Sequence, residues 1–185
     1  MRPVLYLDFD GCLHPEPVYW RPHRGAYLDA RLVAAGHRLF EHAGLLEELL
    51  EPYPSVAIVL STTWAVQHGC SRAAKRLPPG LRSRVIGATY HSSMDSTAFR
   101  LIPRGQQVLD DVARRRPTTW LALDDVDEGW GDARDHVVIT DEVHGIAEPT
   151  VLAKVRSALE RFEAPAFLDE LAPDASLPGR ITLPR

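Results

Sequence analysis

Short runs of consecutive apolar residues alternate along the chain with longer stretches in which apolar residues recur at helical spacing. Continuous apolar runs are typical of strands buried on both faces of a parallel sheet, and five such strands are predicted, at 4–7, 56–60, 84–89, 119–123 and 136–140. Amphipathic helices are predicted at 39–50, 64–76, 104–115 and 148–162. This alternation predicts an α/β fold, Rossmann-like and three-layered, with a mainly parallel central sheet of about five strands.

Three stretches depart from the alternation. Residues 14–36 contain three prolines among aromatic and basic residues, and we expect an irregular flap over the end of the first strand. Residues 91–103 are polar without a clear period and predict a loop. Residues 164–185 hold four prolines and predict an extended C-terminal tail, so that one domain spans residues 1–163.

The composition is ordinary for a single soluble domain of 185 residues, with 45% hydrophobic and 25% charged residues. The net charge of -4 argues against non-specific nucleic-acid binding, although an Arg-lined surface stays open because only Lys75 and Lys154 of the 21 basic residues are lysines. Cys12 and Cys70 are too few for a disulfide framework or a zinc site. With no apolar run near the ~20 residues of a membrane span and no signal peptide, a cytoplasmic protein without a membrane partner is expected.

Polar residues follow three of the predicted strands at the point where each ends. Asp8 and Asp10 follow the first strand, Ser61 follows the second, and Asp124 and Asp125 follow the fourth. Since the intervening helices return the chain, these strand ends lie at one edge of the sheet, where such folds bind ligands. Four clustered carboxylates repel one another, and Mg²⁺ is the hard cation that oxygen ligands of this kind suit.

With these residues the chain resembles the haloacid dehalogenase superfamily of phosphohydrolases. Its first motif is matched by Asp8-Phe9-Asp10-Gly11-Cys12-Leu13, with Cys12 where Thr or Val is more common. The other motifs are matched in order by Ser61 after the apolar run 56–60, Arg104 after Pro103, and the pair Asp124-Asp125. The resemblance covers residues 3 to about 160. Within the superfamily, the chain is similar to a small branch associated with RNA-repair proteins, through Ser61–Trp64, Ile86–Thr89 and Asp124-Asp125.

The resemblance implies a role for each matched residue. Asp8 would attack phosphorus to form an aspartyl-phosphate, and Asp10 would protonate the leaving group and later deprotonate the hydrolytic water. Arg104 would stabilise the phosphoryl charge and orient Asp8. The implied phosphate-binding set is Asp8, Gly11, Ser61, Thr62 and Arg104. The implied Mg²⁺ ligands are Asp8, Asp10, Asp124 and Asp125.

Several assignments have alternatives. Ser61 competes with a role as helix N-cap, in which case Thr62 or Thr63 is the phosphate contact. Arg100 competes with Arg104, and the sequence does not choose between Asp124 and Asp125 as the direct metal ligand.

Other acidic residues and Cys12 are either interpreted as structural or are weaker candidates for the site. The pair Asp110-Asp111 is predicted on a solvated helix face, and Asp127 and Asp132 are weaker candidates for the site. Cys12 has no histidine partner at motif spacing and is interpreted as a small packing residue.

The spacing of the motifs leaves room for a small flap only, which predicts a minimal cap and an open site. Open sites in this superfamily tend to serve macromolecular substrates or to borrow a cap from a partner subunit. The predicted function is therefore a Mg²⁺-dependent phosphomonoesterase acting on a phosphorylated small molecule or a nucleic-acid end. The alternative is a metal- and phosphate-binding regulatory module with little turnover, which contacts RNA or protein through the flap at Trp20–Arg24 and the basic helix end at Arg114–Arg116.

Overall fold

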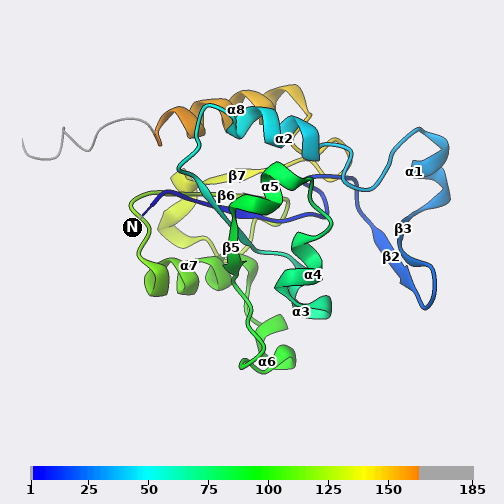
Figure 1. Ribbon diagram of the computed structural model, residues 1–185, viewed down its shortest axis with the longest axis horizontal. Coiled ribbons are helices and arrows are strands. Elements are labelled where there is room, and N and C mark those ends of the chain that lie inside the picture. Colours follow the sequence, from blue (N-terminus) through cyan, green and yellow to red (C-terminus); the bar gives the residue numbers. More distant parts are fainter. Residues whose placement is uncertain (1, 163–185) are drawn as a thin grey trace, which may run out of the picture.

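The computed structural model describes residues 2–162, and the tail predicted over 164–185 lies outside them. Five parallel strands form the central sheet in the order β5-β4-β1-β6-β7 (Figure 1). Their bounds are β1 Val4–Leu7, β4 Ala57–Leu60, β5 Val85–Ala88, β6 Trp120–Asp124 and β7 Val137–Ile139. The predicted α/β fold with a parallel five-stranded sheet is confirmed.

Helices cover both faces of the sheet, because alternate side chains of each strand point to opposite faces. Leu5 and Leu7 of β1 belong to the larger core, under α2 (Ala43–Leu50), α5 (Pro79–Arg84) and α8 (Pro149–Glu160). Val4 and Tyr6 belong to the smaller core, under α7 (Arg104–Arg115) and the 3₁₀-helix η1 (Gly131–His136). Figure 1 shows α2 and α8 on one side of the sheet and α7 on the other.

The prediction of one continuous helix over residues 64–76 is wrong. Gly69 adopts a φ of +81°, a value that L side chains rarely take, and it divides the segment into α3 (Thr63–His68) and α4 (Cys70–Ala74). The predicted loop at 91–103 contains α6 (Ser96–Arg100), which Asp95 caps by accepting a hydrogen bond from the Ala98 N–H at 2.7 Å. The break at Gly69 and the five residues of α6 are both too short to show in the hydrophobic periodicity of the sequence.

The flap at 14–36 is not irregular. It holds an antiparallel hairpin, β2 (Val18–Arg21) and β3 (Gly25–Leu28), followed by the short helix α1 (Ala30–Ala34). In Figure 1 this unit projects from the side of the sheet. Aromatic and β-branched residues favour strands, and Pro22 lies in the turn, where proline does not interrupt the pairing.

No helix within residues 2–162 is long and apolar enough to cross a bilayer.

Candidate active site

The carboxyl ends of the three central strands bring together the residues that the sequence singles out. Backbone bonding continues past the strands: the Asp8 N–H donates to Leu123 O at 3.1 Å, and the Ser61 N–H donates to Leu7 O at 2.8 Å. Asp8, Ser61 and Asp124 are each at least 97% buried. The sheet backbone therefore fixes the position of these side chains.

Arg104 links the three strand ends through its guanidinium group. Its Nη2 lies 3.2 Å from Asp8 Oδ2, its Nε lies 3.4 Å from Asp124 Oδ2, and its Nη1 donates to Ser61 O at 2.8 Å. Burial alone would lower the pKa of Arg104, but the neighbouring carboxylates raise it, so the group stays charged. Arg100 has no such contacts within the described residues and is exposed at the end of α6, so the geometry favours Arg104 over Arg100.

The first turn of α7 lies close to the loop after β6, which holds Arg104 in place. The Gly105 N–H donates to Glu128 O at 2.8 Å. A Cβ on Gly105 would lie 2.6 Å from the carbonyl oxygen of Gly129, closer than real Cβ atoms come. Only glycine permits this approach of helix to loop.

Three carboxylates converge at the same edge of the sheet. One oxygen each of Asp8, Asp124 and Asp125 lies within 4.8 Å of the others. Burial raises the pKa of Asp8, and Asp10 raises it further against the opposing effect of Arg104. The pKa of Asp124 is well above its usual value, again mainly through burial and then through Asp8.

The charge balance at this cluster fits a divalent cation. Asp124 Oδ1 accepts from the Val126 N–H at 3.1 Å, whereas Asp124 Oδ2 is buried and accepts no hydrogen bond within residues 2–162. Its cationic neighbour there is Arg104, whose Nε lies 3.4 Å away as an ion pair and not as a hydrogen bond. One arginine thus faces three clustered carboxylates, and negative charge remains for a divalent cation to balance. Asp124 and Asp125 both belong to the cluster.

Gly11 makes room for this cluster. Its φ is +64°, and a Cβ there would lie 2.5 Å from Asp125 Cγ. Both the backbone conformation and the space require glycine at this position.

Asp10 has different partners from the other carboxylates. Its Oδ1 accepts from Trp64 Nε1 at 2.8 Å and is paired with His14 Nε2 at 3.0 Å, while its Oδ2 lies 3.5 Å from Thr63 Oγ1. Among the described residues, the carboxylate of Asp10 is not part of the three-carboxylate cluster. Oδ1 therefore has two close partners, whereas Oδ2 accepts only the long hydrogen bond from the Thr63 hydroxyl among the described residues.

The sequence did not identify His14 or Trp64 as site residues. His14 is fully buried, and its ring packs against Phe40 and Trp64 with centroids 4.8 and 6.0 Å away. The signal for His14 in the sequence was its position four residues after Asp10. Pairing at that spacing depends on the turn that the chain makes at Gly11.

The N-cap of α3 is Thr62 and not Ser61. Thr62 accepts from the Trp64 N–H at 3.4 Å, and its hydroxyl also lowers the pKa of Asp8 by a hydrogen bond. Ser61 Oγ is buried and has no hydrogen-bond partner among the described residues. A buried hydroxyl without a partner next to Asp8 is suited to bind a phosphoryl oxygen.

Glu16 is a further acidic neighbour that the sequence did not indicate. Burial raises its pKa, and its side chain is hydrogen-bonded to that of Asp125. In turn, burial, Asp8 and Glu16 raise the pKa of Asp125 to about 7. The signal for Glu16 was weak because it follows the motif inside the proline-rich flap.

The interpretation of Asp111 as a solvated residue is wrong. Asp111 is 2% exposed, Tyr6 donates to its Oδ2 at 3.1 Å, and Arg115 Nε lies 2.5 Å from the same oxygen. Arg114 pairs with its Oδ1. The basic helix end predicted as a contact surface is therefore partly used within the fold.

Asp127, Asp132 and Cys12 all lie outside the three-carboxylate cluster. Asp127 pairs with Arg134, and Asp132 is exposed in η1. Cys12 is buried, as a packing residue should be, and its Sγ lies 3.1 Å from the Thr140 hydroxyl, which donates to Gly11 O. Burial raises the pKa of the Cys12 thiol well above its usual value, so it stays protonated.

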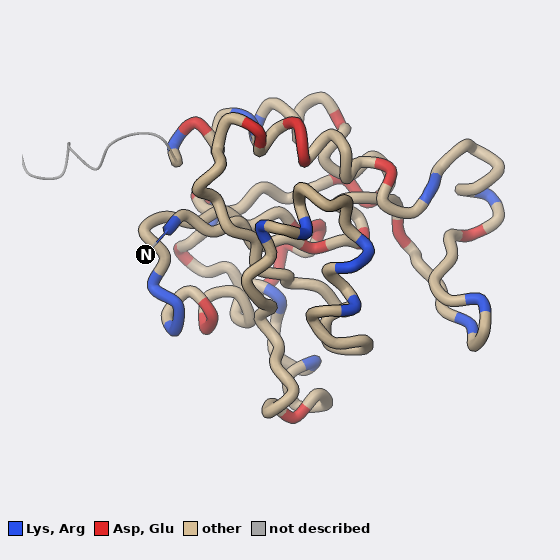
Figure 2. The backbone as a smooth tube through the Cα atoms, viewed as in Figure 1, with Lys and Arg blue, Asp and Glu red and all other residues tan. Residues whose placement is uncertain are grey.

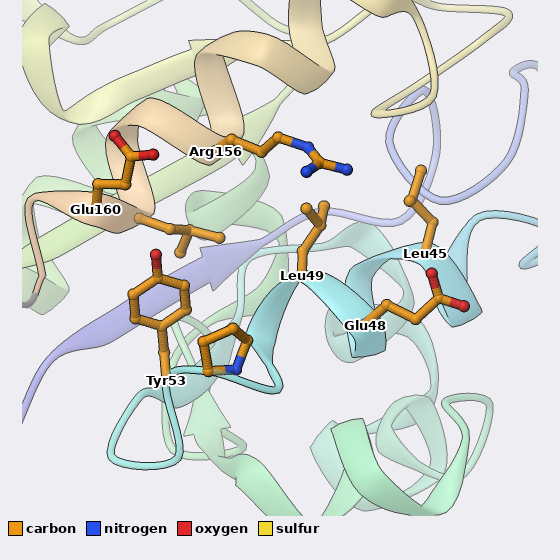
Figure 3. A pocket seen from close by; sticks show the side chains of 8 residues that line it. Leu45, Glu48, Leu49, Tyr53, Arg156 and Glu160 are labelled. Carbon is orange, nitrogen blue, oxygen red and sulfur yellow. The ribbon is translucent and has the colours of Figure 1, made fainter.

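A separate hollow of about 230 Å³ lies between α2 and α8 (Figure 3). It is lined by apolar side chains such as Leu45 and Leu49 together with Arg156 and Glu160, and none of the predicted site residues takes part.

A family model described as the HAD domain in Swiss Army Knife RNA repair proteins matches residues 4–151. Neither the curated proteins nor the solved structures contain a match to the chain.

Proposed function

Because the chain belongs to the family of HAD domains in Swiss Army Knife RNA repair proteins, a branch of a phosphohydrolase superfamily, we propose that it is a Mg²⁺-dependent phosphomonoesterase. The observation that carries the proposal is the position of Asp8. Its carboxylate lies at the carboxyl edge of the sheet, 3.2 Å from Arg104, in a cluster with two further carboxylates. A carboxylate beside a cation and a metal-binding cluster can approach a phosphate despite its own charge.

Asp8, Asp124 and Asp125 would hold the metal. Bound there, Mg²⁺ would neutralise negative charge on the carboxylates and on the phosphoryl oxygens. The carboxylate of Asp10, turned toward Trp64 and His14, would keep its proton-transfer role instead.

In the first step, Asp8 attacks phosphorus and the bond from phosphorus to the leaving oxygen breaks. Asp10 gives its proton from Oδ2 to that oxygen. Ser61 Oγ donates a hydrogen bond to a phosphoryl oxygen, and Arg104 stabilises the charge of the transferred group. In the second step, Asp10 takes a proton from the water that hydrolyses the aspartyl-phosphate, and Asp8 is regenerated.

The substrate class follows from the family and from the size of the flap. The family is named for RNA repair proteins, which supports a substrate from nucleic acid, and the flap of one hairpin with a short helix leaves room for a large substrate. A phosphorylated small molecule or a nucleic-acid end is therefore the proposed substrate. We further propose a reducing cytoplasm as the location, since Cys12 and Cys70 are both free thiols.

The test compares the wild type with Asp8→Asn on an aryl phosphate. We expect Mg²⁺-dependent turnover that EDTA abolishes, a loss of turnover in Asp8→Asn, and a phosphoryl group on Asp8 in acid-quenched samples analysed by mass spectrometry. Asp132→Asn, which removes an exposed carboxylate, is the matched control and should keep full activity. Turnover by Asp8→Asn, or wild-type inactivity on nucleotides, sugar phosphates and end-phosphorylated RNA, would overturn the proposal and favour a binding module.

A further inference from the structure

A basic groove lies beside the active site, between α3–α4 and the chain that follows β5. Its volume is about 740 Å³, and neither Asp nor Glu is among its lining residues. The cations in the lining are Arg72, Lys75 and Arg115. His68 also lines the groove, but burial and the neighbouring Arg76 and Arg72 lower its pKa, so it adds no charge at pH 7. In a protein of net charge -4, a hollow with one sign of charge attracts anions.

The sequence shows the same separation of charge. No acidic residue occurs between Glu51 and Asp95, although the chain has 25 in all. Figure 2 shows Lys and Arg in blue, without red between them, along the segment that Figure 1 labels α4 and α5. The positive face is therefore a property of one continuous segment.

Two cations of the groove are free to bind a ligand. Arg72 and Lys75 are exposed and form no ion pair or side-chain hydrogen bond within the described residues. Arg115 is instead paired with Asp111. An unpaired Arg or Lys contacts phosphate without first breaking another interaction.

The groove continues toward the proposed nucleophile. A neighbouring hollow of about 430 Å³ has Arg100 and Arg104 in its lining together with one acidic residue, Glu128. Val66 lines both hollows. Arg104 contacts Asp8, and Arg100 is exposed and unpaired among the described residues. Cations are thus placed from the catalytic edge of the sheet, past Arg100, to Arg72 and Lys75.

An aromatic side chain of the flap reaches the same groove. The ring of Trp20 lies against that of His68, with centroids 4.5 Å apart, and Trp20 remains 48% exposed. Free faces of exposed tryptophans stack on nucleic-acid bases irrespective of sequence.

We infer that this groove binds the sugar-phosphate backbone of a single-stranded polynucleotide whose terminal phosphate occupies the active site. The inference rests on the proposed function for the end that reacts, but the groove and its charges are independent of the catalytic residues. Arg100, Arg72 and Lys75 contact successive phosphates, and Trp20 stacks on a base. This mode of binding depends on the backbone and carries little sequence preference.

The test measures binding in the Asp8→Asn background, so that no substrate is consumed. The probes are fluorescent single-stranded RNAs of about ten nucleotides, one phosphorylated at the 5′ end and one at the 3′ end, followed by fluorescence anisotropy. Arg72→Ala/Lys75→Ala should weaken binding of at least one probe roughly tenfold and reduce the slope of log K against log salt by about 1.4, or 0.7 for each lost phosphate contact.

The matched control is Lys154→Ala/Arg156→Ala, which removes the same charges from α8 and should leave both the affinity and the slope unchanged. Trp20→Ala should also weaken binding roughly tenfold with no change in the salt slope, and Trp20→Phe should restore part of the loss. Equal affinities for the groove variant and the control, or a mononucleotide bound as tightly as the oligonucleotides, would overturn the inference.

Turnover of the aryl phosphate separates this inference from the proposed function. In the wild-type background, Arg72→Ala/Lys75→Ala should retain turnover of that small substrate and lose activity on the phosphorylated RNA. A protein that hydrolyses the aryl phosphate but shows no effect of the groove variant refutes the groove alone. A protein that binds RNA through the groove without hydrolysing any phosphate refutes the proposed function alone.

Discussion

Asp125→Asn should make the metal-free protein more stable at alkaline pH. Asp125 lies at the carboxyl end of β6 in the cluster with Asp8 and Asp124, and its side chain is hydrogen-bonded to that of Glu16. Burial, Asp8 and Glu16 raise its pKa from 3.8 to about 7. A neutral amide of nearly the same shape removes the charge that the folded protein disfavours.

The sign follows from proton binding. Between pH 3.8 and about 7 the folded protein keeps a proton on Asp125 that the unfolded chain has lost, so the free energy of unfolding falls as the pH rises through this window. At about 1.4 kcal/mol per pH unit, the full shift corresponds to roughly 4 kcal/mol. Because Asp125 is partly exposed, solvent screening lowers this value, and we expect about 2 kcal/mol at pH 8.

Urea unfolding in EDTA at about pH 5 and about pH 8 measures the effect. At the higher pH the Asn variant should be about 2 kcal/mol more stable than the wild type, and at the lower pH the difference should shrink to about 0.8 kcal/mol, because only 1.2 of the 3.2 pH units between the two pKa values have been passed. Added Mg²⁺ should reverse the order, because a ligand that binds only the folded protein stabilises it and the variant has lost a ligand. Asp132→Asn, an exposed site, should show no difference at either pH, and an Asp125→Asn variant no more stable than the wild type at pH 8 in EDTA would refute the reasoning.

Three further substitutions test other parts of the structure. Gly11→Ala should lower Mg²⁺ affinity at least tenfold in a metal titration of activity, because its methyl group displaces Asp125 and its positive φ strains the backbone. Trp64→Phe should reduce kcat about tenfold with little change in KM, since it removes the N–H that holds Asp10, and the loss should be larger for alkyl than for aryl phosphates. Tyr6→Phe should destabilise the protein by about 1–2 kcal/mol in urea and leave activity unchanged, because its hydroxyl donates to a buried carboxylate far along the chain.

For each of these three substitutions, one outcome would contradict the prediction. Unchanged metal dependence in Gly11→Ala would mean that the side chain of Asp125 moves without effect on the site. Equal losses for alkyl and aryl phosphates in Trp64→Phe would indicate damage to packing rather than to proton transfer. Reduced activity in Tyr6→Phe at full stability would place the buried network in the active site.

The elements that the sequence predicted well have local signals. The strands at Val4–Leu7 and Ala57–Leu60 are apolar on both faces, and the carboxylates and Ser61 follow them directly, so topology alone brought them to one edge. The hairpin at Val18–Leu28 was missed because its prolines suggested irregular structure, although they lie before the strands and in the turn.

Long-range partners explain the remaining errors. Asp111 looked like a surface residue because its hydrogen-bond donor, Tyr6, is 105 positions away in the sequence. His14 and Trp64 became visible as partners of Asp10 only once the turn at Gly11 and the start of α3 were in place. Pairings of this kind leave no periodic pattern in the sequence.

The central position of β1 has a consequence for synthesis of the protein. The strand that carries the proposed nucleophile is made before both of its neighbours in the sheet, which begin at Ala57 and Trp120. Until the second of these has left the ribosome, β1 has an unpaired edge and Asp124, at the end of β6, is missing from the cluster around Asp8. Parallel pairing at such separations is slow to form, so until β6 has been made the nascent chain carries an apolar strand that is only partly protected from association.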